Sequence, residues 1–274
     1  MKMGCMHMAG WLAGLALLLG ALCSAAAWEI PLTQVERAVA LNGTLPATCS
    51  ESEVGTLVAE ATRRTGETQL AAVPAGWLES GLEAGALYAG EVDRVIGQDY
   101  SLCTAVLSPA QLKAWLEYGV SRLVTDEGER IDLERSAWEG FPQMSGLVWT
   151  YDVSAPAGQR VLSVQLEGEA LDLTAAGPVL SLTAPRAMLD GGLGYPELEW
   201  TQTEYTARAS LLSYIQSAQT LEVPTKQATV VGTASYPLAE QLPLAAIVGA
   251  CILIAVFSSV IRRTYKKHFT FENA

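Results

Sequence analysis

The stretch from residue 101 to residue 119 reads SLCTAVLSPAQLKAWLEYG and joins a strand to a helix. Its first seven residues form a short apolar run, which predicts a buried strand. Ser108 then supplies a helix N-cap, Pro109 suits the first turn, and Gln111 completes the cap at the third position. The buried face of this helix is expected to consist of Leu112, Trp115 and Leu116, and Gly119 marks its end.

A second capped helix is expected earlier in the chain. Ser50 and Glu53 fit a capping box, in which the serine hydroxyl accepts from the Glu53 amide and Glu53 reaches back. Apolar residues then recur at i, i+3, i+4 and i+7 and form one stripe, and Gly66 ends the helix. The pattern predicts an amphipathic helix that packs on a core.

From Gly146 onward the apolar pattern changes to period two, which is typical of strands. A third helix is expected over residues 204–219, and a final short strand within 220–241. The other expected strands cover residues 69–73, 147–153, 160–166 and 179–183. Helices and strands are intermixed along the chain, so the fold class is expected to be α+β with mixed sheets.

The two ends of the chain have the composition of targeting and membrane segments. Residues 1–27 place one lysine before an apolar run and end in small residues, as in a secretory signal peptide, with an uncleaved anchor as the alternative. Residues 242–261 carry no charge, and four cations follow in the tail, 262–274. This pattern predicts a single transmembrane helix with a cytoplasmic tail rather than a buried core helix. We therefore expect a cell-membrane protein with an extracellular domain at 28–222 and a stalk at 223–241.

Charge and cysteine content narrow the possible partners and cross-links. The net charge is −12 and no Lys/Arg cluster is visible before the tail, so nucleic acid is not expected as a partner. Cys49 and Cys103 are the two cysteines outside the expected signal and membrane segments. In an oxidising compartment they favour one disulfide, with two separate buried thiols as the alternative.

The histidine inventory excludes the catalytic systems that depend on histidine. The sequence has two histidines, His7 and His268, and they fall in the expected signal and tail. A domain without histidine cannot use a His general base, a Ser-His-Asp or Cys-His nucleophile system, or nearly any catalytic zinc site. Carboxylates are plentiful, so a two-carboxylate glycosidase is not excluded, but their spacing singles out no pair. No metal, cofactor or catalytic residue is expected.

Six segments resemble, in order and at family spacing, the C-terminal domain of the 5'-nucleotidase family. They are ESEVGTLVAEA (51–61), LEAGALYAGEVDRVI (82–96), SPAQLKAWLEYGV (108–120), FPQMSGLVWTYDVSAPAGQRVLSVQLEGEALDL (141–173), GGLGY (191–195) and LLSYIQ (211–216). The resemblance implies a mixed-sheet α+β domain that binds the nucleoside part of a substrate. In the family an N-terminal metallophosphoesterase domain holds two metal ions and cleaves the ester, and this sequence does not resemble that domain.

The resemblance also implies ligand-binding positions, and most of them differ here. The family's Asn-Gly-Gly-Ile-Arg segment aligns with 74–79, so Glu79 stands where a substrate-binding arginine is implied, and Thr48 replaces another arginine. Gly97-Gln98 replaces a stacking Pro-Phe. In the GGDGY turn Leu193 replaces the aspartate. The candidate substrate-binding residues are Trp77, Gln98, Gly191, Gly192, Leu193 and Tyr195.

Two functions are compatible with this sequence. The first is a membrane-anchored, non-catalytic binding or accessory module, in which Tyr195, Trp77 and Leu193 line an apolar cleft for a nucleoside-like, aromatic or sugar ligand. In a purely structural version of it, the glycine turn serves folding alone and Tyr195 is merely packed. The second is the substrate-binding half of a split 5'-nucleotidase whose metallophosphoesterase is a separate chain. In neither case is the chain expected to be an enzyme on its own.

Overall fold

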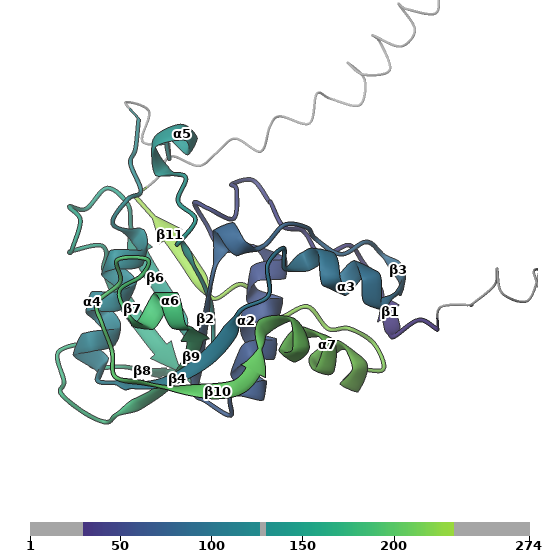
Figure 1. Cartoon of the computed structure of the whole chain (residues 1–274). Helices are drawn as coiled ribbons and strands as arrows, with labels where there is room; N and C mark the ends of the chain where they lie inside the picture. Colours follow the sequence, from purple (N-terminus) through teal and green to yellow (C-terminus); the bar gives the residue numbers. More distant parts are fainter. Residues whose placement is uncertain (1–29, 127–129, 233–274) are drawn as a thin grey trace, which may run out of the picture.

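The computed structural model describes residues 30–126 and 130–232. In these ranges helices and strands are intermixed, so the expected α+β class is confirmed (Figure 1). The expected signal segment (1–27) and the expected membrane helix (242–261) lie outside the described residues. None of the helices within 30–126 and 130–232 is long and apolar enough to cross a membrane.

A five-stranded mixed sheet forms the centre of the domain, in the order β10-β4-β9-β2-β5. β2 and β9 run parallel, and the other neighbours are antiparallel. The carboxyl end of β2 and the amino end of β4 therefore lie at the same edge of the sheet. The strands are β2 (Leu70–Pro74), β4 (Ser101–Leu107), β5 (Pro142–Ser145), β9 (Leu180–Pro185) and β10 (Trp200–Thr206).

A four-stranded sheet in the order β11-β6-β7-β8 packs against this centre. Its strands are β6 (Val148–Asp152), β7 (Val161–Leu166), β8 (Glu169–Ala170) and β11 (Ala228–Val231). β11 pairs with β6 in parallel, which confirms the final short strand. The folded domain thus continues through β11, past the boundary at residue 222 that the sequence led us to expect. A separate pair joins β1 (Thr33–Val35) to β3 (Gly85–Leu87).

Helices cover both faces of the central sheet and create two hydrophobic cores. α2 (Glu53–Thr65) lies on one face, and α7 (Ala207–Ser217) and α3 (Ala89–Val95) group beside it (Figure 1). α4 (Pro109–Val120), α6 (Arg186–Leu189) and the four-stranded sheet share the core on the other face. The short elements are η1 (Ala75–Trp77) and α5 (Leu133–Ser136).

The helix boundaries confirm some of the expected caps and correct others. Ser108 and Gln111 form the expected capping box of α4, and Gly66 follows the last residue of α2. The N-cap of α2 is Ser52, whose hydroxyl accepts from the Gly55 amide at 3.0 Å. The expected cap at Ser50 is wrong, because its hydroxyl bonds backbone carbonyls instead.

The third helix also begins later than expected. Residues 204–206 belong to β10, which pairs with β4, and Thr206 caps α7 at its first turn. α3 is not among the expected helices, since its seven residues are too few to show a clear period.

The expected Cys49–Cys103 disulfide is not formed. Both side chains are free thiols and fully buried. Cys49 lies ahead of α2, whereas Cys103 lies on β4. The alternative of two separate buried thiols therefore describes this part of the chain.

Candidate functional site

A cleft of about 350 Å³ lies where β2 ends and β4 begins, and we call it the Trp77 cleft. Three of its residues belong to η1 and the turn that follows β2, and three belong to the loop that leads into β4. The lining consists of Gly76, Trp77, Glu79, Gln98, Asp99 and Tyr100. The arrangement of the sheet therefore brings two distant segments together at one edge.

Backbone contacts fix the two walls of the cleft relative to each other. Leu78 and Ile96 form an antiparallel bridge, and the Glu79 amide donates to the Val95 carbonyl at 2.9 Å. Both Leu78 and Ile96 are buried in the core that α2 and α7 share. The side chains that face the cleft thus project from a rigid frame.

Two aromatic rings provide the apolar surface of the Trp77 cleft. The ring centroids of Trp77 and Tyr100 lie 4.6 Å apart, and their planes are tilted by 57°. Trp77 is half-buried, so part of its ring is open to a ligand. The Tyr100 hydroxyl is buried and has no hydrogen-bond partner among the described residues. Burial, and secondarily the charge of Asp99, raises the pKa of Tyr100, which keeps this hydroxyl neutral.

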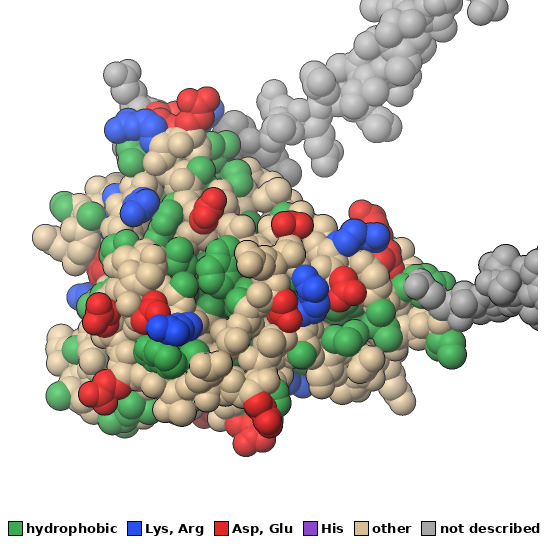
Figure 2. All heavy atoms as spheres, in the orientation of Figure 1, with side chains coloured by type: hydrophobic (Ala, Val, Ile, Leu, Met, Phe, Trp, Pro, Cys, Tyr) green, Lys and Arg blue, Asp and Glu red, His purple; other side chains and the backbone are tan. Residues whose placement is uncertain are grey.

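The charged groups that line the cleft are acidic, and no Lys or Arg is among its lining residues. The Glu79 carboxylate lies over Gly97: a Cβ added to Gly97 would be 1.8 Å from Glu79 Oε1. Within the described ranges Glu79 has no ion pair. On the face shown in Figure 2, basic side chains are scattered among acidic ones and form no broad basic surface.

The second carboxylate of the cleft, Asp99, is held by backbone groups. Its Oδ1 accepts from the amides of Tyr100 and Arg208, both at 3.0 Å. Arg208 lies in the first turn of α7, where helix amides partly offset a negative charge. The Arg208 guanidinium itself donates to the Ile96 carbonyl at 2.8 Å and approaches Asp93 to 3.8 Å. Glu79 is therefore the less compensated of the two acids.

The predicted site residues separate into two groups in the structure. Trp77 and Gln98, two of the candidate substrate-binding residues, both line the cleft. Gly191, Gly192 and Leu193 do not line it and instead form a turn after α6. Gly191 and Gly194 have φ of +79° and +82° in this turn, which explains why glycine is retained at both positions.

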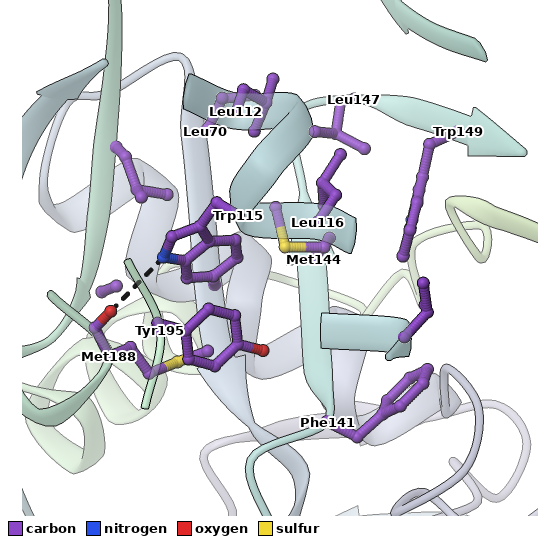
Figure 3. Close-up of a cluster of buried hydrophobic side chains, with 14 of the residues drawn as sticks. Leu70, Leu112, Trp115, Leu116, Phe141, Met144, Leu147, Trp149, Met188 and Tyr195 are labelled. Carbon is purple, nitrogen blue, oxygen red and sulfur yellow. Dashed lines mark hydrogen bonds between the residues drawn. The ribbon is translucent and has the colours of Figure 1, made fainter. Parts of the chain in front are cut away.

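Tyr195 is part of the core and not of a ligand cleft. Its ring is 2% exposed and stacks on Trp115 with centroids 4.2 Å apart (Figure 3). Tyr118 and Trp138 contact the same ring at 4.9 and 5.6 Å, and we call these four residues the Tyr195 cluster. The hydroxyl donates to the Gly140 carbonyl at 2.8 Å. The expected cleft shared by Tyr195, Trp77 and Leu193 is absent from the described part of the chain, and the packed alternative for Tyr195 holds.

Sequence reasoning missed two members of the site, Asp99 and Tyr100. They follow directly after Gly97-Gln98, the positions that the resemblance did identify, and they precede the predicted strand by one or two residues. That proximity was the only available signal. In the part of the chain that the structure covers, no group of three or more His, Cys, Asp or Glu residues is arranged to hold a metal ion.

Solved structures with a similar fold include three bacterial nucleotidases. The 5'-nucleotidase precursor of Thermus thermophilus has a TM-score of 0.64 at 22% identity, over 82% of this chain and 44% of that one. A putative 5'-nucleotidase of Staphylococcus aureus has a TM-score of 0.60 at 16% identity, over 74% and 41%. The NAD nucleotidase of Haemophilus influenzae has a TM-score of 0.58 at 15% identity, over 74% and 38%. The chain thus spans less than half the length of each, and the likeness shows the fold.

Sequence comparison points to the same domain. The trifunctional nucleotide phosphoesterase protein YfkN of Bacillus subtilis (strain 168) is 27% identical over 121 residues, which are 43% of this chain and 8% of that protein. The model of the 5'-nucleotidase C-terminal domain matches residues 33–176, a range that contains the whole Trp77 cleft. The chain therefore belongs to the 5'-nucleotidase C-terminal domain family.

Proposed function

We propose that this chain is a non-catalytic binding module that takes the ring part of a nucleoside-like ligand in the Trp77 cleft and disfavours phosphate. The observation that carries the proposal is the combination of the Trp77–Tyr100 ring pair with the unpaired Glu79 carboxylate in one cleft. The ring pair offers a surface for a flat group. The carboxylate stands where the resemblance implies a substrate-binding arginine.

The energies of these two contacts oppose each other for a nucleotide. Stacking of a base on an aromatic side chain contributes about 1–3 kcal/mol in nucleic-acid complexes. At an effective dielectric near 20, two like charges 4 Å apart repel by about 4 kcal/mol. A phosphate near Glu79 would thus cancel the gain from stacking. We expect AMP to bind with millimolar or weaker affinity and adenosine to bind no worse than AMP.

Phosphoester hydrolysis by the chain itself is not expected. Both histidines of the sequence lie outside the described domain, at positions 7 and 268, and two-metal hydrolysis depends on a dedicated ligand set. The purified chain should release no phosphate from AMP or UDP-sugars with Mn²⁺, Zn²⁺ or Co²⁺ present. Metal-dependent hydrolysis that survives re-purification, and that a substitution in the described domain abolishes, would refute this part.

Calorimetric titration of the purified chain with adenosine and with AMP tests the binding proposal. Trp77→Ala should abolish adenosine binding. Trp200→Ala is a matched control, because Trp200 is also half-buried but lies on β10 with Arg186 over its ring at 4.8 Å. Micromolar AMP affinity, or adenosine binding that Trp77→Ala leaves unchanged, would contradict the proposal.

A second candidate is the substrate-binding part of a two-chain nucleotidase. It is favoured by the size of the similar nucleotidases, each of which is more than twice as long as the part that this chain covers. In this case AMP hydrolysis should co-purify with the tagged chain from its own host, and Trp77→Ala should abolish that activity. Absence of any co-purifying phosphoesterase would favour the first candidate.

We also propose that the domain faces the cell exterior and is tethered by residues 242–261. The support is the uncharged run itself and the four cations after it, at Arg262, Arg263, Lys266 and Lys267. Protease added to intact cells should digest the domain and spare an epitope placed after residue 274. Protection of the domain would refute this topology.

A further inference from the structure

The aromatic rings of the Trp77 cleft favour a flat ligand, and the acidic groups around it favour a ligand that is also positively charged. We propose that the cleft binds an aromatic organic cation, which stacks on Trp77 and pairs with the Glu79 carboxylate. This inference rests on the proposed function, since it specifies the ligand of the same cleft. It adds a preference for positive charge to a preference for a flat ring.

The first argument is that the Glu79 carboxylate lines a cavity and, unlike Glu53 and Asp190, has no ion pair among the described residues. Glu53 pairs with Arg37 at 2.9 Å, and Asp190 pairs with Arg186 at 2.9 Å. In the ranges 30–126 and 130–232 no cation is paired with Glu79. Its carboxylate is held over Gly97, at the wall of a cavity, where a ligand can reach it.

The second argument concerns which rings of the domain already carry a cation. Three half-buried rings each lie under an arginine, with 4.8–5.0 Å from guanidinium carbon to ring centroid. These pairs are Arg64 over Tyr214, Arg122 over Trp138 and Arg186 over Trp200. Among the described residues no Lys or Arg lies over Trp77. The negative face of its indole ring therefore remains available to a cation from outside.

The third argument is that Arg208, which bonds the segment beside the cleft, does not line the cleft. The Arg208 guanidinium donates to carbonyl groups of Ile96 and Gly97 and faces Asp93 of α3. Its backbone amide, at the start of α7, donates to Asp99. Asp99 is thereby partly compensated, so we expect Glu79 to carry most of the preference for a cation and Asp99 less.

A charge series on one nucleoside tests the inference with the full chain. AMP is an anion, adenosine is neutral, and 1-methyladenosine carries a positive charge on the base at neutral pH. We expect 1-methyladenosine to bind about tenfold more tightly than adenosine, since a cation–π contact and an ion pair each add to stacking. AMP should bind most weakly, and added salt should reduce the preference for the cation.

Variants of Glu79 give the decisive comparison. Glu79→Gln should remove the preference for 1-methyladenosine, and Glu79→Arg should reverse the order so that AMP binds best. Glu83→Gln is the control, because Glu83 is an exposed acid of the same segment outside the cleft. Thermal melts verify that each variant is folded, as expected for a side chain that is exposed and unpaired.

The outcomes separate this inference from the proposed function. If adenosine binds at least as tightly as 1-methyladenosine, or if Glu79→Gln keeps the preference, the cation inference is wrong while the binding proposal stands. If none of the three ligands binds, or if Trp77→Ala weakens none of them, both are wrong.

Discussion

The Trp77 cleft and the Tyr195 cluster use the same residue types in opposite ways. In the Tyr195 cluster the Tyr195 ring stacks on Trp115 and Trp138, and its hydroxyl donates to the Gly140 carbonyl, so neither its ring nor its hydroxyl is free for a ligand. In the cleft the Trp77 ring is half-open, and Glu79 and the Tyr100 hydroxyl have no described partner. Retention of a glycine turn thus reflects folding, whereas ligand chemistry is indicated by polar groups without partners.

Truncation of the buried ring should have the largest effect on stability. Tyr195→Ala removes a fully buried ring and its hydrogen bond, and we expect a loss of about 3–5 kcal/mol in the free energy of unfolding. Trp77→Ala should cost less than about 1.5 kcal/mol, because its ring is half-exposed and little is unpacked. Urea denaturation measures both. If Trp77→Ala lowered the free energy of unfolding as much as Tyr195→Ala, the distinction between an open cleft and a packed cluster would be wrong.

Two carboxyl groups outside the cleft, those of Glu51 and Glu60, should make the stability of the domain depend on pH. The Glu51 carboxylate accepts from the amides of Gln227 and Ala228 at 2.6 Å, at the start of β11, and burial raises its pKa to about 7. The folded chain therefore retains a proton that the unfolded chain, with the ordinary pKa of 4.5, releases. Stability from Glu51 is fully present below pH 4.5 and should be lost as the pH rises to about 7, by at most about 3 kcal/mol.

Glu60 produces the opposite trend at acid pH. Although burial opposes ionisation, hydrogen bonds from Arg63, Ser145 and Arg64 lower its pKa to about 2, so its contribution is lost as the pH falls from 4.5 toward 2. Thermal melts between pH 2 and pH 8 should therefore show maximal stability near pH 4.5–5. Glu51→Gln should flatten the decline between pH 5 and pH 8. An unchanged decline in this variant would show that Glu51 is not its source.

Gly146 and Gly97 form a matched pair, because an added methyl group would clash with backbone at the first and with a side chain at the second. Gly146 has φ of +91°, and a Cβ there would lie 1.9 Å from the Gln69 carbonyl oxygen, which is backbone. Gly146→Ala should cost about 2–3 kcal/mol. At Gly97 the clashing atom is the end of the exposed Glu79 side chain, so Gly97→Ala should cost little stability. It should instead displace the carboxylate and weaken binding of 1-methyladenosine. Equal stability losses for the two variants would contradict this distinction.

Reducing conditions should have no effect on stability, because the two buried cysteines are free thiols. Cys49 and Cys103 are unbonded, so adding a reductant should leave the melting temperature unchanged. Burial raises the pKa of both thiols, and alkylation should proceed only after unfolding. A disulfide closing this loop would contribute roughly 4 kcal/mol. A clear fall in melting temperature on adding reductant would therefore show that the disulfide is formed.

The parts of the fold that the sequence predicted depend on local cues. The Ser108 capping box and the Gly66 stop act within one helical turn, and the structure has both. The true cap of α2 depends on a distant residue: the Ser52 amide and hydroxyl both donate to the side-chain oxygen of Gln143. No pattern around Ser50 carries that information.

The sequence predicted only part of the candidate site. Trp77 and Gln98 could be placed by resemblance, because the segments that contain them align in order. Tyr195 was misplaced, because its burial depends on Trp115 and Trp138, which come from other parts of the chain. The residues around Asp99 form no recognisable motif. Its carboxylate is held in the site because α7 approaches it and the Arg208 amide donates to it.

The central claim is that ligands bind at Trp77 and not at Tyr195, and indole N–H signals in NMR spectra test it most directly. The seven tryptophans of the ¹⁵N-labelled chain give separate probes in both regions, and Trp77→Phe assigns the signal of interest. Titration with adenosine should shift the Trp77 indole signal and leave those of Trp115 and Trp138, beside Tyr195, in place. A shift of the Trp115 or Trp138 signal with Trp77 unaffected would contradict the account.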